Sequence, residues 1–207
     1  MDKLDDELVK FAYQKIEFKL ANFDQIKRSC TTKLNNNLDF IREEACKSIC
    51  FGLYQGAIGL TNHLIESFLR LNLAIRESKA TEYNEHSLIE INKNFLNRSS
   101  DEFGKLINSA KSLGLITKDQ AKKIDKYRVD WRNPFSHGSS HQLLKNSGTV
   151  KMFSTSISGI SEVKDVEIQG HYQLHGFMQA AKAAKEAIPY FNFVDNLIID
   201  FYENLKK

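Results

Sequence analysis

The sequence predicts an all-α helical bundle that carries one small β-hairpin before its last helix. Three observations support this fold class. Apolar residues recur at intervals of three and four over most of the chain, only two prolines interrupt it, and a stretch rich in β-branched residues precedes the C-terminal helical pattern. The chain has 207 residues, of which 42% are hydrophobic, which is the length and composition of one domain with a sizeable core. We therefore expect a single domain over residues 1–207, with the hairpin at about 149–169.

Two long helices are predicted first. One extends from about Leu4 to Ile26, and a longer, central one extends from about Leu38 to Arg76. The apolar face of the first contains Val9, Ala12, Ile16, Leu20 and Phe23, and that of the second contains Cys46, Ile49, Leu53, Ala57, Leu60, Leu64, Phe68 and Leu71. A further line on the central helix contains Gly52, Gly56, Gly59, His63, Glu66 and Arg70. Glycine is costly inside a helix, so we interpret these glycines as sites of close packing by a neighbouring helix or a second protomer.

Two shorter helices are predicted next. A polar segment from TEYNEH to LNRSS separates the central helix from a helix near Asp101–Ser112, which ends at Gly114. Thr117 begins the following helix, because its hydroxyl and the side chain of Gln120 can form a capping box. Pro134 removes an amide and restricts the residue before it, which predicts a kink or a break at this point.

The C-terminal part contains the hairpin and the last helix. The segments TVKMFSTSI and EVKDVEIQ predict two strands that are joined by a turn around Gly159. The last helix is predicted from about Gly176 to Leu205, with a bend at Pro189. Its inward face is predicted to contain Met178, Ala181, Ala184, Ile188, Phe191, Val194, Ile198, Phe201 and Leu205.

The segment WRNPFSHG, residues 131–138, contains the residues that are best suited to chemistry. It places the permanently charged guanidinium of Arg132 five positions before the titratable imidazole of His137. Cleavage of RNA by its own 2′-hydroxyl needs a base for that proton, an acid for the leaving oxygen and a cation for the phosphate charge. One histidine cannot be base and acid at once, so a symmetric dimer would supply the second group.

This segment resembles the HEPN domain family, whose signature is an arginine, a polar residue and, after a short spacer, a histidine. The resemblance is close from roughly Phe103 to Gly138. It implies a helical bundle that dimerises with the two motifs facing each other, and a metal-independent endoribonuclease that leaves a 2′,3′-cyclic phosphate. Such enzymes occur as toxins of toxin–antitoxin pairs and in antiphage defence. By this resemblance Arg132 would neutralise the scissile phosphate, His137 would move the proton, and Asn133 would orient the imidazole or bind the phosphate.

The same resemblance leaves an alternative of a different class. The HEPN family also contains non-catalytic members that serve as scaffolds for a nucleotide, an antitoxin or a regulatory protein, and the layout is similar to the mannitol operon repressor family. From the residues alone, Arg132 could instead pair with a neighbouring carboxylate and His137 could end a helix favourably, but the functional interpretation is preferred.

Two further residues are predicted to support the site. Glu66 could hold Arg132 in place, although a network within the helix among His63, Glu66 and Arg70 is an equal alternative. Arg128 lies one turn before Arg132 and could extend a cationic strip along a phosphate backbone. The region contains three acidic residues and six cations, namely Lys118, Lys122, Lys123, Lys126, Arg128 and Arg132. The alternative for the lysines is a solvated helix face.

The remaining patterns predict no cofactor and no metal. The pairs His137 with His141 and His171 with His175 have the spacing of zinc-binding helices, but they lack an accompanying acidic residue in a zincin pattern. The cysteines Cys30, Cys46 and Cys50 are odd in number, which favours free thiols in a reducing compartment. We expect a cytoplasmic protein with no membrane contact, because no apolar run is long enough to span a bilayer and charges fill the N-terminal segment. The expected partners are RNA, a second copy of the chain and, as a possibility, an antitoxin protein.

Overall fold

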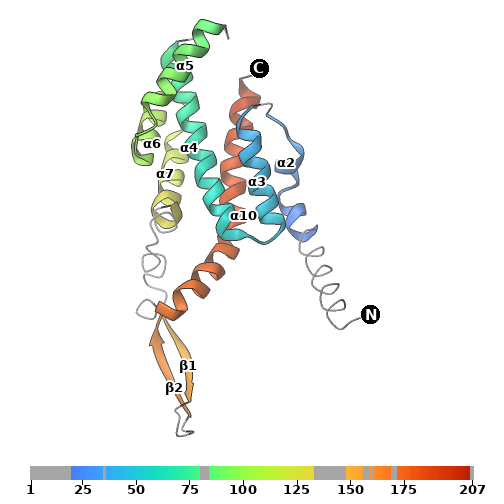
Figure 1. Cartoon of the computed structure of the whole chain (residues 1–207), viewed down its shortest axis with the longest axis vertical. Coiled ribbons are helices and arrows are strands. Elements are labelled where there is room, and N and C mark those ends of the chain that lie inside the picture. The colour runs from blue at the N-terminus through green and yellow to red at the C-terminus, as the bar shows by residue number, and fades with distance from the viewer. Residues whose placement is uncertain are drawn as a thin grey trace.

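The described part of the chain is mostly helical, with a two-stranded antiparallel hairpin before the last helix, as predicted. The structure, a computed structural model, describes residues 20–34, 36–79, 84–132, 148–155, 159, 161–168 and 172–205. Its elements are α2 (Lys27–Thr31), α3 (Leu38–Cys50), α4 (Tyr54–Ser78), α5 (Glu85–Asn97), α6 (Phe103–Ser112), α7 (Lys118–Tyr127), the π-helical turn η1 (Arg128–Arg132), β1 (Thr149–Thr155), β2 (Ser161–Glu167) and α10 (Tyr172–Asn204). Figure 1 shows their arrangement. Within the described residues, no helix combines the length and the apolar character needed to cross a membrane.

The N-terminal region is described only in part. Residues 20–25 are helical, a turn follows at Ile26, and α2 begins at Lys27. Most of the helix predicted from Leu4 to Ile26 lies outside the described residues. Ile26 is buried, whereas Leu20, which was predicted on the apolar face, is 63% exposed.

The single central helix predicted from Leu38 to Arg76 is wrong, because the chain turns between α3 and α4. Gly52 has a φ of +73°, which an L-residue with a side chain rarely adopts. Its amide donates to the carbonyl of Ile49, and the amide of Leu53 donates to that of Ser48, which together form a Schellman motif. The apolar spacing runs through this break without a change of period. The pattern therefore could not reveal two helices that pack side by side.

A second difference is α5, which occupies the segment predicted to be a polar connection. Asn84 and Ser87 form a capping box at its start, in which each side chain accepts a hydrogen bond from the other residue's amide. Ile91 is its one buried residue. Leu88, Ile91 and Phe95 nevertheless recur at intervals of three and four, so this spacing and the capping residues were the available signals.

The next two helices agree with the predictions. The Thr117 hydroxyl accepts a hydrogen bond from the Gln120 amide, and the Gln120 side chain accepts one from the Thr117 amide. Gly114 has a φ of +70° and ends α6 in a second Schellman motif. The chain therefore turns sharply between α6 and α7, so that the two helices pack against each other.

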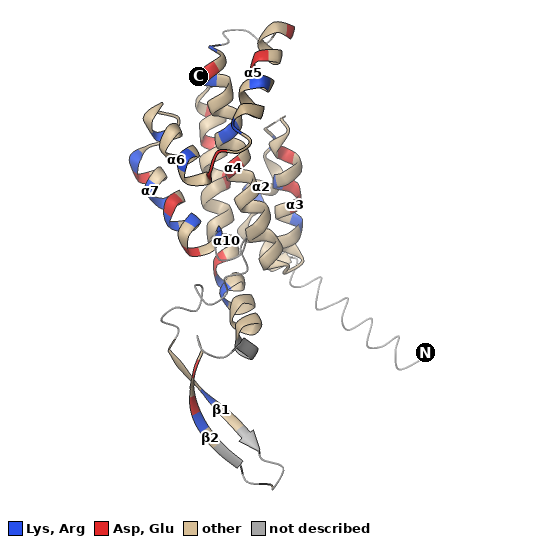
Figure 2. Cartoon of the chain, turned by 60° about the vertical axis from the view of Figure 1, so that its left-hand side comes forward, with Lys and Arg blue, Asp and Glu red and all other residues tan. Residues whose placement is uncertain are grey.

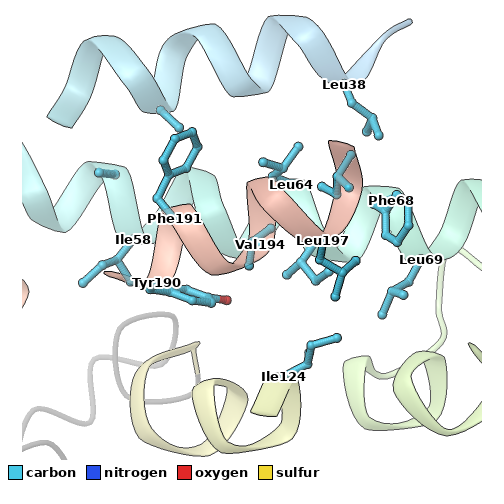
Figure 3. Packing of buried hydrophobic residues seen from close by; sticks show 14 of the residues in the cluster. Leu38, Ile58, Leu64, Phe68, Leu69, Ile124, Tyr190, Phe191, Val194 and Leu197 are labelled. Carbon is cyan, nitrogen blue, oxygen red and sulfur yellow. The ribbon is translucent and has the colours of Figure 1, made fainter. Parts of the chain in front are cut away.

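Helix α4 lies at the centre of the bundle. It packs against α3 and α10 on one side and against α5, α6 and η1 on the other, as Figure 1 shows. The buried core runs between these elements, and Figure 3 shows the side chains that α3, α4, α7 and α10 contribute to it. They include Leu38, Ile58, Leu64, Phe68, Leu69, Ile124, Tyr190, Phe191, Val194 and Leu197.

Helix α10 contains Pro189 and bends along its length, as Figure 1 shows. The proline removes a backbone hydrogen bond of the helix, which is a common cause of such a bend. The predicted inward face is correct in the second half of the helix, but Leu205 is 67% exposed. In the first half it is wrong, because Ala181 and Ala184 are exposed while Ala183 and Ala187 are buried. The prediction applied one helical period on both sides of Pro189, so it did not include this change in which residues face the core.

The hairpin extends away from the helical body, as Figures 1 and 2 show. Its strands pair antiparallel from Thr149 opposite Glu167 to Thr155 opposite Ser161. Phe153 and Val163 lie directly opposite each other and are both largely exposed. The strands agree with the predicted span of about 149–169.

Candidate functional site

Arg132 is the last residue of η1, the π-helical turn that continues α7. A π-helical turn is rare and widens the helix, which changes the direction of the side chains that follow it. The sequence predicted an irregularity at Pro134, and in the structure the irregularity already begins at Arg128. The turn packs against α4, which brings Arg132 to the face of the central helix that contains Glu66.

Glu66 and Arg132 form an ion pair. The Arg132 Nε atom donates to Glu66 Oε1 over 2.9 Å, and the two side chains are 25% and 17% exposed. The expected contact between these two residues is therefore present, although they lie 66 positions apart in the sequence. A half-buried carboxylate that receives the Nε–H fixes the plane of the guanidinium, while part of the arginine side chain remains in contact with solvent. The catalytic role of the pair stays a prediction.

A buried polar layer lies beside this pair. The Tyr190 hydroxyl, on α10, donates to Asn62 Oδ1 over 2.8 Å, and both residues are almost fully buried. The Tyr127 ring stacks on that of Tyr190 with 4.2 Å between the ring centroids. Burial raises the pKa of Tyr190, the negative charge of Glu66 raises it further, and Arg132 lowers it. Tyr190 is therefore a neutral hydrogen-bond donor next to the ion pair.

Sequence reasoning missed this layer. Asn62 lies one helical turn before Glu66, so helical spacing alone could have placed it beside the site. Its Nδ2 atom is buried and, among the described side chains, lacks a hydrogen-bond partner. Tyr190 and Tyr127 come from other helices. No local pattern indicated that they would meet near Glu66.

Arg128 has a partner on its own helix. Its Nε atom donates to Asp125 Oδ1 over 2.8 Å. The guanidinium also lies over Gly104 of α6, where a Cβ atom would stand 3.8 Å from its Cζ. Arg128 is therefore fixed between α6 and α7, and its predicted role in phosphate binding is not tested by this geometry.

The lysines of α7 are interspersed with acidic residues, as Figure 2 shows. Lys126 forms an ion pair with Asp130, and the Lys123 ammonium lies 4.1 Å from the centre of the Phe193 ring. Both lysines are exposed. The geometry agrees with the alternative of a solvated helix face as well as with a weak polyanion surface.

Glu66 and Arg70, which lie on the same face of α4, bind different partners. The Arg70 Nε atom donates to the carbonyl of Arg98 at the end of α5, whereas Glu66 pairs with η1. His63 is exposed. Among the residues that the structure describes, nothing lies within 4 Å of a Cβ atom built at Gly56 or Gly59, so the close packing expected there is not found between described residues. Packing by a second protomer stays a prediction.

Asn133 and His137 lie outside the described residues, so their predicted roles have no geometry to compare with. The histidine pairs considered for zinc include residues that also lie outside. Among the residues that the structure describes, no group of three or more His, Cys, Asp or Glu side chains is placed to hold a metal ion.

Comparisons of the chain with models of protein families, with curated proteins and with solved structures find no match. The functional assignment therefore depends on the residues of this chain and on their geometry.

Proposed function

We propose that the protein is a metal-independent endoribonuclease of the HEPN type. In this proposal two copies of the chain form a cleft in which the 2′-hydroxyl of RNA attacks the adjacent phosphate. The physiological setting is a toxin–antitoxin pair or antiphage defence in the cytoplasm, with an antitoxin as the possible protein partner. The observation that supports it best is the Glu66–Arg132 ion pair at the start of the RNPFSH segment.

The pair supports this chemistry because it orients a permanent cation. In the transition state, negative charge grows on the phosphate oxygens, and a guanidinium whose orientation is already fixed stabilises that charge with little reorganisation. Glu66 accepts the Nε–H and so fixes the plane of the Arg132 guanidinium, whose permanent charge would then act on the phosphate. His137 would take the proton of the 2′-hydroxyl, and its counterpart in the second copy would give a proton to the leaving 5′-oxygen.

The second candidate is a non-catalytic scaffold of the same family. The observation that favours it is again the ion pair, because an arginine held by a half-buried carboxylate also serves to fix η1 on α4. The two candidates differ in what His137 does. A scaffold has no need of a titratable group at that position.

The test is cleavage of a fluorescent single-stranded RNA by the purified full chain in EDTA. The nuclease is expected to give fragments that end in a 2′,3′-cyclic phosphate, identified by mass spectrometry. Arg132→Ala and His137→Ala should each reduce the rate by at least about 100-fold. Matched controls are Arg28→Ala, which removes an exposed arginine of α2 that also pairs with carboxylates, and His86→Ala, which removes an exposed histidine of α5.

The outcomes separate the candidates. Cleavage that is lost in the two site variants and kept in both controls supports the nuclease. Cleavage that persists in His137→Ala points to a contaminant and removes the assignment. A folded protein that binds RNA or a protein partner but cuts nothing is the result that supports the scaffold.

A further inference from the structure

The three cysteines of the chain meet in the tertiary structure, although Cys30 lies on α2 and the other two on α3. Helix α2 packs against α3, and the side chains of Cys30, Cys46 and Cys50 face the same cavity. Cys46 and Cys50 are one helical turn apart and present their side chains to α2 from the same face of α3. Cys30 of α2 therefore shares one cavity with two thiols of α3.

All three thiols line one cavity. It has a volume of about 370 Å³, is open to solvent on one side and is lined by the end of α2, the segment that follows it and one face of α3. Charged side chains at its wall include Lys33 and Lys47, and both form ion pairs with Glu43. A cavity of this size admits a small molecule, and its lining brings that molecule to sulfur atoms.

The three thiols differ in their access to solvent. Cys46 is buried with 6% of its surface exposed, whereas Cys30 and Cys50 are half-buried. None of the three forms a disulfide in the structure. A reagent in the cavity therefore reaches Cys30 and Cys50 more readily than Cys46, and reactivity of a thiol requires such access.

We propose that Cys30 and Cys50 are a modification site, at which a low-molecular-weight disulfide in the cavity converts the two thiols into an intramolecular disulfide. One of the two thiolates attacks a sulfur of the reagent and displaces one small thiol, leaving a mixed disulfide. The second cysteine then attacks the protein sulfur of the mixed disulfide and displaces the second small thiol. Two protein thiols are oxidised by two electrons, one small disulfide is reduced to two thiols, and these carry away both protons.

The new bond ties α2 to the end of α3. It closes the chain between residues 30 and 50, which includes the connection from α2 to α3. A cross-link of this kind restricts the unfolded chain and so favours the folded state. It also changes the lining of the cavity. This proposal does not depend on RNA cleavage, because none of its residues belongs to the Arg132 site.

The surroundings of Cys30 make this a slow reaction at neutral pH. Burial raises the pKa of the Cys30 thiol and Asp195 of α10 adds to this, whereas the other two cysteines and Arg42 oppose it. The wall of the cavity also carries Asp39, Glu43, Lys33 and Lys47. The thiolate is the attacking form, so the rate should rise as the pH rises towards the pKa.

The test exposes the full chain to glutathione buffers of increasing disulfide content, stops exchange with acid and measures the intact mass. The expected product is lighter by two hydrogen atoms and carries no glutathione, and peptide mapping without reductant should join the segments that contain Cys30 and Cys50. Cys46→Ala should form the same product. Cys30→Ser and Cys50→Ser should stop at one bound glutathione, and circular dichroism checks that each variant is folded.

Three results would overturn the proposal. They are an unchanged mass at every buffer ratio, glutathione adducts without an internal bond in the unaltered chain, and a mapped bond from Cys30 to Cys46 in place of Cys50. The unaltered chain is decisive by itself. The proposal therefore stays falsifiable if a cysteine variant fails to fold.

Discussion

Two arginines of this chain pair with carboxylates in contrasting surroundings. Arg42 of α3 has 3% of its side chain exposed and binds Asp195 of α10 through Nε at 2.5 Å. It also donates to Asp39 at 2.6 Å and to the carbonyls of Ser29 and Thr32. Arg132 of η1 keeps a quarter of its side chain exposed and binds Glu66 through Nε. Hydrogen-bond acceptors therefore enclose the Arg42 guanidinium, whereas Arg132 is bound at Nε and keeps part of its side chain in solvent.

The surroundings of the two guanidinium groups distinguish a structural arginine from a candidate functional one. Burial alone lowers the pKa of Arg42, but the hydrogen bonds and charges of Asp195 and Asp39 outweigh this and raise it. Arg42 thus joins α2, α3 and α10 and is enclosed by this network. Arg132 has the access to solvent that a ligand requires.

The largest effect is expected for Arg42→Ala. The substitution leaves the Asp195 carboxylate, which has no exposed surface, without its counter-ion, and should lower the free energy of unfolding by about 3–5 kcal/mol. Urea denaturation followed by circular dichroism measures it. Arg28→Ala removes an exposed ion pair and should cost about 1 kcal/mol or less. Equal losses of unfolding free energy in the two variants would show that the enclosed Arg42 network stabilises the fold no more than an exposed ion pair does.

The second prediction concerns Glu66→Gln, which keeps the shape of the side chain and removes its charge. If Glu66 positions Arg132, RNA cleavage should fall about tenfold, in kcat more than in KM, because the guanidinium meets its phosphate charge mainly in the transition state. The free energy of unfolding should change by about 1 kcal/mol or less. A large loss of stability with an unchanged kcat would instead make this pair a structural one, like that of Arg42.

The third prediction compares Gly59, which lies inside α4, with Gly52, which lies in the turn between α3 and α4. Gly59 of α4 is exposed, and no described residue lies within 4 Å of a Cβ atom built there, so Gly59→Ala should raise the free energy of unfolding by about 0.5–1 kcal/mol. Gly52→Ala should lower it by about 1–2 kcal/mol, because Gly52 has a positive φ. Thermal unfolding of both variants measures the contrast. Destabilisation by Gly59→Ala would mean that a second protomer or another group contacts this line.

The smallest effect is expected at Asp101, which lies with Arg98 between α5 and α6. A hydrogen bond from Lys105 lowers the pKa of Asp101, and the charges of Lys105 and Arg98 lower it further. A depressed folded-state pKa adds stability above the unfolded value of about 3.9, and this stability is lost as the pH falls through the folded-state value. Asp101→Asn should therefore cost about 0.5–1 kcal/mol at pH 7. The difference from the unaltered chain should shrink below about pH 4, and acid and urea titrations that show a constant difference would exclude this origin.

The sequence could predict those parts of the fold that local chemistry determines. The Thr117 and Gln120 cap, the turn at Gly114 and the two strands of the hairpin agree with the structure. Each depends on residues a few positions apart. The break at Gly52 was missed because the apolar period continues through it, and α5 was missed although Leu88, Ile91 and Phe95 keep a helical spacing, because polar residues surround them.

At the candidate site, the sequence by itself determined which residue types are present and in what order, namely Arg132, Asn133 and His137 after a capped helix. Only the tertiary structure decided that Tyr190 and Asn62 lie beside the Glu66–Arg132 pair, that Arg42 is the enclosed cation, and that the three cysteines line one cavity. The physical reason is that spacing along a helix specifies which side chains share a face, whereas the partner of that face depends on how separate helices pack.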